Sequence, residues 1–192
     1  MSDKIVELPS SEVVKAELDR ARSRSTFLKL LYNTVASLIV VAAISVLISM
    51  LFLPVLRVTG TSMTPTLEND QLVVCRRMGG FERGDIIAFY HNNKILLKRV
   101  IGLAGDTVDI ALDGTVSVNG EKLDEPYVDA LAYGTCNIKL PYQVPENRVF
   151  VMGDHRSDSI DSRTKEIGCI AEEMVVGKVI WCIWPFGSIK AY

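Results

Sequence analysis

Two residues in the sequence are of the types needed for nucleophilic catalysis. Ser62 lies in the segment VTGTSMTPTL, residues 58–67, shortly after a long apolar segment. Lys98 lies in the segment ILLKRVIG, residues 95–102, among apolar neighbours. A serine hydroxyl is a weak nucleophile at neutral pH and needs a base to accept its proton. We therefore interpret Ser62 as a candidate nucleophile and Lys98 as its candidate general base.

Lys98 can serve as a base only if its amine is neutral. In a strand, alternate residues share a face, so Lys98 is expected beside Leu96 and Val100 on an apolar surface. Lowering a lysine pKa by about three units costs roughly 4 kcal/mol, which burial can impose. Two alternatives remain open: Lys98 lies at a sheet edge and extends its amine into water, and Ser62 is an ordinary turn residue.

A third polar segment, residues 153–163, reads GDHRSDSIDSR and follows an apolar stretch. Its hydroxyls and charges are typical of a solvated loop. They also suit a supporting role, in which one hydroxyl orients the lysine amine and an Asp/Arg pair locks the loop. Other serine-enzyme patterns fail, because residues 60–64 lack the final glycine of a nucleophile elbow and residues 62–65 lack the lysine of S-x-x-K. Neither His91 nor His155 lies in a recognisable triad setting.

The element that must hold Ser62 near a membrane is the apolar segment 30–56, which contains no charged residue. A helix of about 20 apolar residues crosses a bilayer, whereas the apolar core of a cleavable signal peptide has about 7 to 15. We expect a retained transmembrane anchor; the alternative is a buried core helix. Basic residues cluster before the segment, which predicts a cytoplasmic tail at 1–29 and an extracytoplasmic domain at 57–192.

Beyond the anchor, β-branched residues and an alternating pattern predict a β domain. The turn dipeptides Asp113-Gly114 and Asn119-Gly120 separate short strands. Residues 125–147 contain three prolines and are interpreted as an irregular surface excursion. The predicted strands cover residues 71–75, 85–90, 95–103, 107–110, 115–118, 149–152 and 174–184.

The composition argues against several classes of protein. A net charge of −2 and a pI near 5.7 do not suit a nucleic-acid-binding surface. The four cysteines lack the close pairing of a zinc site, so neither a metal nor another cofactor is expected. Cys136 and Cys169 fall in loop-like sequence and are candidates for a disulfide outside the cytoplasm, the alternative being free thiols.

Four separate motifs, in this order and spacing, resemble the conserved boxes of type I signal peptidases, the membrane-anchored Ser/Lys proteases of family S26. They are Ser62-Met63 with Pro65-Thr66-Leu67; Arg83-Gly84-Asp85-Ile86-Ile87; Lys98-Arg99-Val100-Ile101-Gly102 with Gly105-Asp106; and Gly153-Asp154 with Ser159, Asp161, Ser162 and Arg163.

The resemblance implies a mostly β fold of antiparallel sheets behind one N-terminal transmembrane helix. It further implies cleavage of signal peptides from secretory preproteins at the outer face of the cytoplasmic membrane, after small residues at positions −1 and −3. The expected partners are therefore preproteins and the lipid membrane. Apolar residues beside the site, Met63 and Leu97, are expected to line shallow pockets.

By the same resemblance, Ser62 is the nucleophile, its N–H is an oxyanion donor, and Lys98 is the general base. Ser159 would hold the lysine amine, while Asp161 and Arg163 would brace the loop. Asp154 is a weaker structural candidate.

Three positions depart from the family pattern. Gly60 replaces a serine whose hydroxyl helps to form the oxyanion hole in Gram-negative members, as is common in Gram-positive ones. Ala104 replaces a proline, and His155 replaces an asparagine. The histidine suggests the hypothesis of a pH dependence near its own pKa.

Two other functions fit parts of the sequence. A self-cleaving repressor-type domain uses similar chemistry, but it would carry a DNA-binding module in place of the apolar segment. A tethered β module that binds partners outside the cell would have no need of Ser62, so its function would survive the change to alanine.

Overall fold

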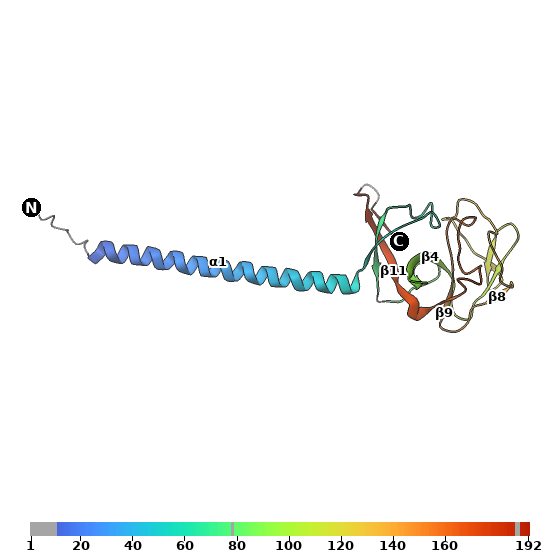
Figure 1. Ribbon diagram of the computed structural model, residues 1–192, viewed down its shortest axis with the longest axis horizontal. Coiled ribbons are helices and arrows are strands. Elements are labelled where there is room, and N and C mark those ends of the chain that lie inside the picture. Colours follow the sequence, from blue (N-terminus) through green and yellow to red (C-terminus); the bar gives the residue numbers. More distant parts are fainter. Residues whose placement is uncertain (1–10, 78, 187–188) are drawn as a thin grey trace, which may run out of the picture. The chain divides into compact units, whose positions relative to one another are not determined.

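The computed structural model describes residues 11–77, 79–186 and 189–192. One long helix, α1 (Ser11–Phe52), precedes the strands, as Figure 1 shows. The chain divides into two compact units with the boundary between Ile48 and Ser49. The second unit contains all the strands and all the candidate site residues.

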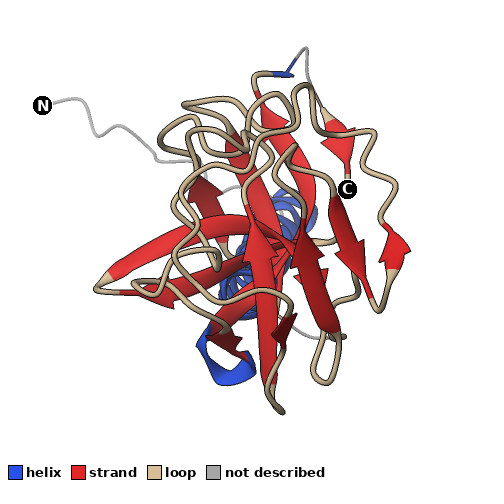
Figure 2. Cartoon of the chain, turned by 90° about the vertical axis from the view of Figure 1, so that its right-hand side faces the viewer, coloured by secondary structure: helices blue, strands red, loops and turns tan. Residues whose placement is uncertain are grey.

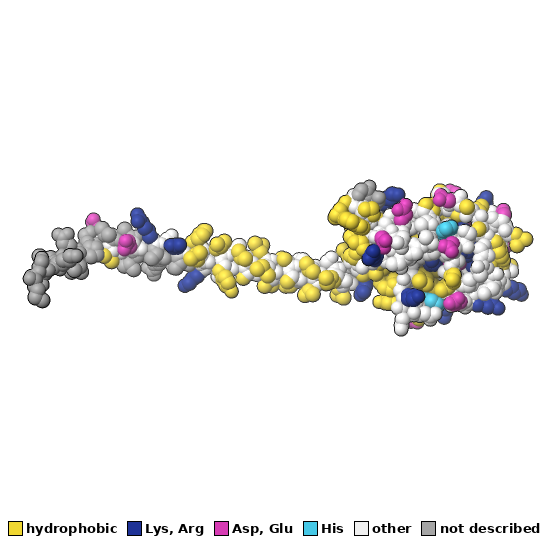
Figure 3. All heavy atoms as spheres, turned by 45° about the horizontal axis from the view of Figure 1, so that its top comes forward, with side chains coloured by type: hydrophobic (Ala, Val, Ile, Leu, Met, Phe, Trp, Pro, Cys, Tyr) yellow, Lys and Arg dark blue, Asp and Glu magenta, His cyan; other side chains and the backbone are white. Residues whose placement is uncertain are grey.

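Helix α1 is apolar along most of its length. The part from Thr26 to Phe52 has 27 residues and is long and apolar enough to span a membrane. At 1.5 Å per residue it measures about 40 Å, more than a hydrocarbon core of about 30 Å. Its hydrophobic side chains point outward along the helix (Figure 3). The surface of this part therefore suits lipid.

The helix ends at Phe52, before the end of the predicted apolar segment 30–56. Pro54 has no N–H to continue the helix and disfavours a helical conformation at the residue before it. Val55 and Leu56 instead belong to the first strand. Residues 11–29 of the predicted tail are helical and continuous with the apolar part, and residues 1–10 lie outside the described residues.

The main sheet is antiparallel throughout and has the strand order β1-β2-β11-β3-β4-β9-β10, with β12 added beside β11. Figure 2 shows the strands of the β unit, which also include those of a smaller second sheet. The strands of the main sheet are β1 (Val55–Arg57), β2 (Leu72–Arg76), β3 (Ile86–His91), β4 (Lys94–Gly102), β9 (Arg148–Met152), β10 (Ile170–Ala171), β11 (Val175–Trp184) and β12 (Lys190–Ala191). A 3-10 turn, η1 (Glu172–Met174), precedes β11.

The second sheet has the order β7-β6-β5-β8. Its strands are β5 (Thr107–Ile110), β6 (Val116–Val118), β7 (Glu121–Lys122) and β8 (Tyr142–Gln143). The predicted turn at Asn119-Gly120 joins β6 to β7 with both residues at positive φ. Asn92 and Asn93 do the same between β3 and β4, since asparagine tolerates the left-handed conformation of a tight hairpin.

All seven predicted strands are confirmed to within one residue at each end, and the mostly β fold with one N-terminal apolar helix is confirmed. The predicted excursion 125–147 is irregular apart from β8. Five short strands, β1, β7, β8, β10 and β12, were not predicted. Each has two or three residues, so its pairing depends on the neighbouring strand rather than on a local pattern.

Three clusters of buried apolar side chains form the core of the β unit. One packs the Ser62 loop, through Met63 and Leu67, against β2, β3 and β11. A second lies between β4, β9 and the second sheet. The third contains Ile87, Phe89 and Val100 from the face of the sheet that also carries Lys98. The core therefore fixes both the loop and the strand that bear the candidate catalytic residues.

Candidate active site

Ser62 lies at the start of a tight turn that is anchored on both sides. Met63 and Leu67 are fully buried, and Leu67 N–H donates to the Met63 carbonyl. Thr64 N–H donates to the Thr61 carbonyl at 3.0 Å, which closes the turn around Ser62. Ser62 itself remains half-buried, with its hydroxyl turned toward Lys98. The loop thus holds a reactive group at the surface by burying its neighbours.

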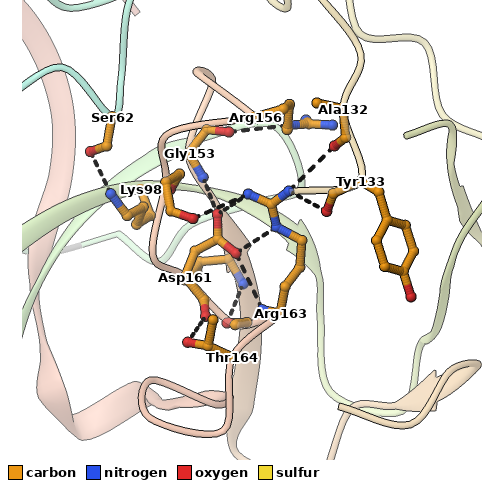
Figure 4. A network of polar contacts seen from close by, with 12 residues as sticks. Ser62, Lys98, Ala132, Tyr133, Gly153, Arg156, Asp161, Arg163 and Thr164 are labelled. Atoms are coloured by element: carbon orange, nitrogen blue, oxygen red, sulfur yellow. Dashed lines mark hydrogen bonds and ion pairs between the residues drawn. The ribbon is translucent and has the colours of Figure 1, made fainter. Parts of the chain in front are cut away.

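Lys98 projects from β4, and its Nζ lies 2.5 Å from Ser62 Oγ, within hydrogen-bonding distance (Figure 4). Ser62 and Lys98 are 36 positions apart in the chain. At this separation a neutral amine can accept the serine proton directly. The structure therefore brings together the two residues that the sequence singled out first.

The surroundings of Lys98 favour its neutral form. The residue is only 4% exposed, and Leu96 and Val100 on its face of β4 pack in one apolar cluster with its cross-strand partner Ile87. Burial lowers the pKa of Lys98 from 10.5 to about 8, although the negative charges of the nearby aspartates oppose this effect. The apolar face predicted from the alternating sequence is confirmed. For that reason a fraction of the amine is already neutral near physiological pH.

Gly153 is the point at which the polar loop 153–163 meets the Ser62 turn. A β-carbon at this position would overlap both the Ser62 carbonyl oxygen and Ser159 Oγ, so only glycine fits. The next contact along the loop is a hydrogen bond from His155 N–H to the Ser62 carbonyl at 3.1 Å. The His155 ring also lies 3.2 Å, Nδ1 to Oγ1, from Thr64. The polar loop therefore supports the backbone on which the serine is mounted.

Asp161 and Arg163 form a fully buried ion pair inside this loop. Two nitrogens of the guanidinium donate to the two carboxylate oxygens, each at 2.8 Å. Asp161 also accepts the Gly153 N–H at 3.0 Å, while Arg163 donates to the Tyr133 carbonyl at 2.9 Å. Figure 4 shows the pair at the centre of these contacts. The pair ties the loop to the excursion around residue 133.

Ser159 is buried next to Gly153, but its hydroxyl has no hydrogen-bond partner in the part of the chain that the structure describes. The hydrogen bond to Lys98 that the family resemblance implies is therefore not among the contacts of Ser159. The Ser162 hydroxyl, by contrast, both accepts a hydrogen bond from the Val151 N–H and donates one to the Gly168 carbonyl.

The candidate oxyanion donors are only partly available. The Ser62 N–H makes no hydrogen bond to any described residue and is free to donate. Gly60 has a φ of 91°, and its N–H already donates to Asn69 Oδ1 at 2.9 Å. The Thr61 hydroxyl likewise donates to Asp158. Gly60 has no side chain, and there is open space at the position that a serine occupies in Gram-negative members of the family.

Asp154, the weaker candidate from the sequence, forms a two-bond ion pair with Arg99, at 2.8 and 2.6 Å. Arg99 itself was not predicted as a site residue. Nor were Tyr127, whose ring lies over the Arg99 guanidinium, and the ion-paired residues Glu125 and Arg156. Arg156 lies in the polar loop and was the easiest to find, whereas the excursion that contains Glu125 and Tyr127 has no local pattern that indicates a functional role.

A groove of about 310 Å³ opens beside the Ser62–Lys98 pair. Its walls are the segment that follows β1 and the first half of β4. It is lined by residues 57–60, 62–63 and 94–98. Met63 and Leu97, expected beside the site, are both among them.

The backbone of the β4 wall of the groove is free to pair with a peptide, whereas on the opposite wall both backbone groups of Val58 and the Gly60 N–H are already hydrogen-bonded. Val100 N–H donates to Asp85, so the alternation of a strand turns the backbone groups of Ile95 and Leu97 away from β3. The pairing of β9 with β4 begins only at Arg99, so it leaves these groups without a strand partner. On the opposite wall only Arg57 belongs to β1, which is the edge strand of the sheet.

The thiols offer no alternative centre. All four cysteines, which lie within the described ranges, are free, so Cys136 and Cys169 do not form a disulfide here. Burial raises the pKa of Cys75 and of Cys169 to about 11, which makes both poor nucleophiles. Among the described residues, no group of three or more His, Cys, Asp or Glu side chains is placed to hold a metal ion.

The fold and site define a β-sheet enzyme with a serine beside a buried lysine, and comparison with known proteins identifies its family. The model of the family described as signal peptidase, peptidase S26, matches residues 31–184. The chain is 40% identical over 177 residues to signal peptidase I of Bacillus licheniformis, covering 83% of this chain and 92% of that protein. It is 35% identical over 170 residues to signal peptidase I S of Bacillus subtilis strain 168, covering 81% and 90%.

Signal peptidase IB of Staphylococcus aureus is 37% identical over 153 residues, or 69% of this chain and 78% of that protein. A crystal structure of a signal peptidase I from Enterococcus faecalis V583 matches 53% of this chain and 97% of that chain, with 32% identity and a TM-score of 0.45. This chain belongs to the signal peptidase family S26 and is a serine endopeptidase. The apolar helix of this chain, together with its relationship to this family, indicates a membrane-anchored protein.

Proposed function

We propose that this protein is a type I signal peptidase that removes signal peptides from secretory preproteins, using Ser62 as nucleophile and Lys98 as general base. The observation that carries the proposal is the 2.5 Å separation of Ser62 Oγ from the amine of a lysine that is only 4% exposed. Solvated lysines keep their charge, so a buried amine next to a serine hydroxyl is a signature of base catalysis.

The reaction proceeds through an acyl-enzyme. The neutral Lys98 amine accepts the Ser62 proton as Oγ attacks the scissile carbonyl, and the Ser62 N–H donates to the oxyanion that develops. Lys98 then gives its proton to the leaving amine. A water molecule, deprotonated by the same amine, attacks the ester and releases the second product. One base thus serves both half-reactions, and Asp161 and Arg163 keep the supporting loop in place.

The groove accounts for the binding of an extended peptide. The free backbone groups of Ile95 and Leu97 lie on one wall and residues 57–60 lie on the other, so a substrate segment can add to β4 as a strand along the groove. In an extended segment the −1 and −3 side chains share one face. The walls beside the serine include Met63, which is fully buried, and Leu97, which is half-buried. Such filled walls leave room only for small side chains at these two positions.

The location follows from the apolar helix and from one exposed surface of the β unit. Five basic residues precede the apolar part of α1 and only Arg57 closely follows it, which favours a cytoplasmic N-terminus and an external catalytic domain. The domains are then a tail at 1–29, an anchor at 30–56 and a catalytic domain at 57–192.

The exposed surface, which we call the aromatic face, carries Trp181, Trp184, Phe186 and Ile189. Trp181 lies in one cross-strand row with Val55, which is exposed and follows the end of α1 by only three residues. A sheet face so near the end of a membrane span meets the lipid interface, where tryptophan is favoured. The nucleophile then works close to the bilayer, where a signal peptide emerges.

The test is cleavage of a preprotein with an Ala-x-Ala site by detergent-solubilised wild type, Ser62→Ala and Lys98→Ala, scored by the N-terminal sequence of the product. Correct cleavage by the wild type and none by either variant is expected. Cleavage that survived in both variants would assign the activity to other residues. Inactivity of a folded wild type would favour a binding role.

A further inference from the structure

The segment Glu125-Pro126-Tyr127 lies in the irregular excursion, outside every motif that pointed to the site. Glu125 forms a two-bond ion pair with Arg156, with one bond at 2.9 Å, and both side chains are buried. Removing one partner from such a pair leaves an uncompensated buried charge, so the contact is sensitive to single substitutions.

Arg156 transmits this contact to the site. Its remaining guanidinium nitrogen, Nε, donates to the Gly153 carbonyl at 3.1 Å (Figure 4). The Gly153 N–H donates to Asp161 on its other side. Both backbone polar groups of Gly153 are therefore held by buried charged side chains. Gly153 is also the residue that abuts the Ser62 carbonyl and Ser159 Oγ.

Tyr127 links the same segment to the second ion pair of the site. Its hydroxyl donates to Glu125 Oε1 at 3.0 Å, and burial together with the Glu125 charge raises the pKa of Tyr127, so the phenol keeps its proton. The Tyr127 ring lies over the Arg99 guanidinium, with the central carbon 3.8 Å from the ring centroid. Arg99 in turn holds Asp154, the residue after Gly153.

We propose that Glu125 and Tyr127 are positioning residues for the Ser62–Lys98 pair. They hold the two arginines that fix residues 153 and 154, and Gly153 sets where the Ser62 backbone lies. The inference rests on the proposed function of Ser62 and Lys98. A displacement of about 1 Å between nucleophile and base can lower the rate about a hundredfold, so loss of this support acts on catalysis before it acts on substrate binding.

The test compares Glu125→Gln and Tyr127→Phe with Glu146→Gln, an exposed glutamate in the same excursion. Each change keeps the shape of its side chain and removes a charge or a hydroxyl. Cleavage of the Ala-x-Ala preprotein is measured at a temperature at which circular dichroism shows every variant to be folded. We expect Glu125→Gln to lower kcat about tenfold or more with KM within about threefold of wild type. Tyr127→Phe, which keeps the ring over Arg99, is expected to lose less.

A double-mutant cycle separates positioning from general destabilisation. If Glu125 acts through Arg156, then Glu125→Gln added to Arg156→Gln lowers kcat no further than Arg156→Gln alone. Independent losses that multiply would overturn the proposal, as would a kcat for folded Glu125→Gln equal to that of Glu146→Gln. An inactive wild type would instead refute the proposed function itself, which keeps the two failures distinct.

Discussion

The pH dependence of cleavage is the most direct test of the buried lysine. With a pKa of about 8, about one tenth of Lys98 is neutral at pH 7 and about nine tenths at pH 9. For an unperturbed lysine the neutral fraction at pH 7 is only about 0.03%. We therefore expect kcat/KM to rise about tenfold between pH 7 and 9 and then to level off.

The lowered pKa of Lys98 also predicts how the free energy of unfolding depends on pH. The folded pKa lies below the ordinary value of 10.5, so between these values the unfolded chain binds the proton more tightly. The charged, buried amine therefore destabilises the fold by roughly 3 kcal/mol below about pH 8, and this penalty disappears as the pH rises through 10.5. Lys98→Met is expected to raise the free energy of unfolding near pH 7 and to have no such effect above pH 10.5.

The assay is the initial rate of preprotein cleavage at substrate concentrations well below KM, with stability measured by urea unfolding at each pH. A rate that kept rising tenfold per pH unit beyond about pH 9 would show that burial does not lower the pKa of Lys98. A pH dependence that disappeared in His155→Asn would assign the effect to the histidine instead. An unchanged profile in His155→Asn would remove the hypothesis that this histidine confers a pH dependence.

Three further predictions concern the loop, the aromatic face and the groove. Gly153→Ala should abolish cleavage, because its β-carbon overlaps two site atoms. The control Gly120→Ala has open space around it and should lose only about 1 kcal/mol of stability, with activity retained. An active Gly153→Ala variant would refute the close approach of Gly153 to the site. Trp181 and Trp184 are the only tryptophans, so brominated lipids should quench the fluorescence of the protein in vesicles, and unquenched emission would place the aromatic face away from lipid. Replacing the −1 alanine of the substrate by leucine should lower kcat/KM at least about a hundredfold, and undiminished cleavage would rule out shallow pockets.

Much of the fold was predictable because its signals are local. Period-two alternation and β-branched residues predicted the seven longer strands, and the length of the uncharged segment predicted the apolar helix. The remaining strands are two- or three-residue pairings whose existence depends on a partner elsewhere in the chain. Val55 and Leu56 show most clearly where local signals fail. Their apolar composition predicted that they belong to the anchor, but in the structure they form the edge strand β1 and pair with β2.

Ser62 and Lys98 were predictable as candidates for the same reason, because one follows the apolar segment and the other interrupts an apolar strand. Their predicted roles rest on the resemblance of the four motifs rather than on either residue alone, since an isolated serine or lysine in a sequence has a more frequent structural explanation. The sequence by itself determined which groups are available and on which face of its strand Lys98 lies. Only the tertiary structure decided that a loop and a strand 36 positions apart meet at 2.5 Å, with the lysine removed from water.

The support of the site was decided almost entirely by the tertiary structure. The Glu125–Arg156 pair joins residues 31 positions apart, and neither residue reveals its partner in the sequence. Buried charges must find a counter-charge wherever the folded chain brings one, and that depends on the packing of distant segments rather than on local periodicity. The chain's pattern thus selects the strands and the reactive residues, and packing selects the partners that hold them.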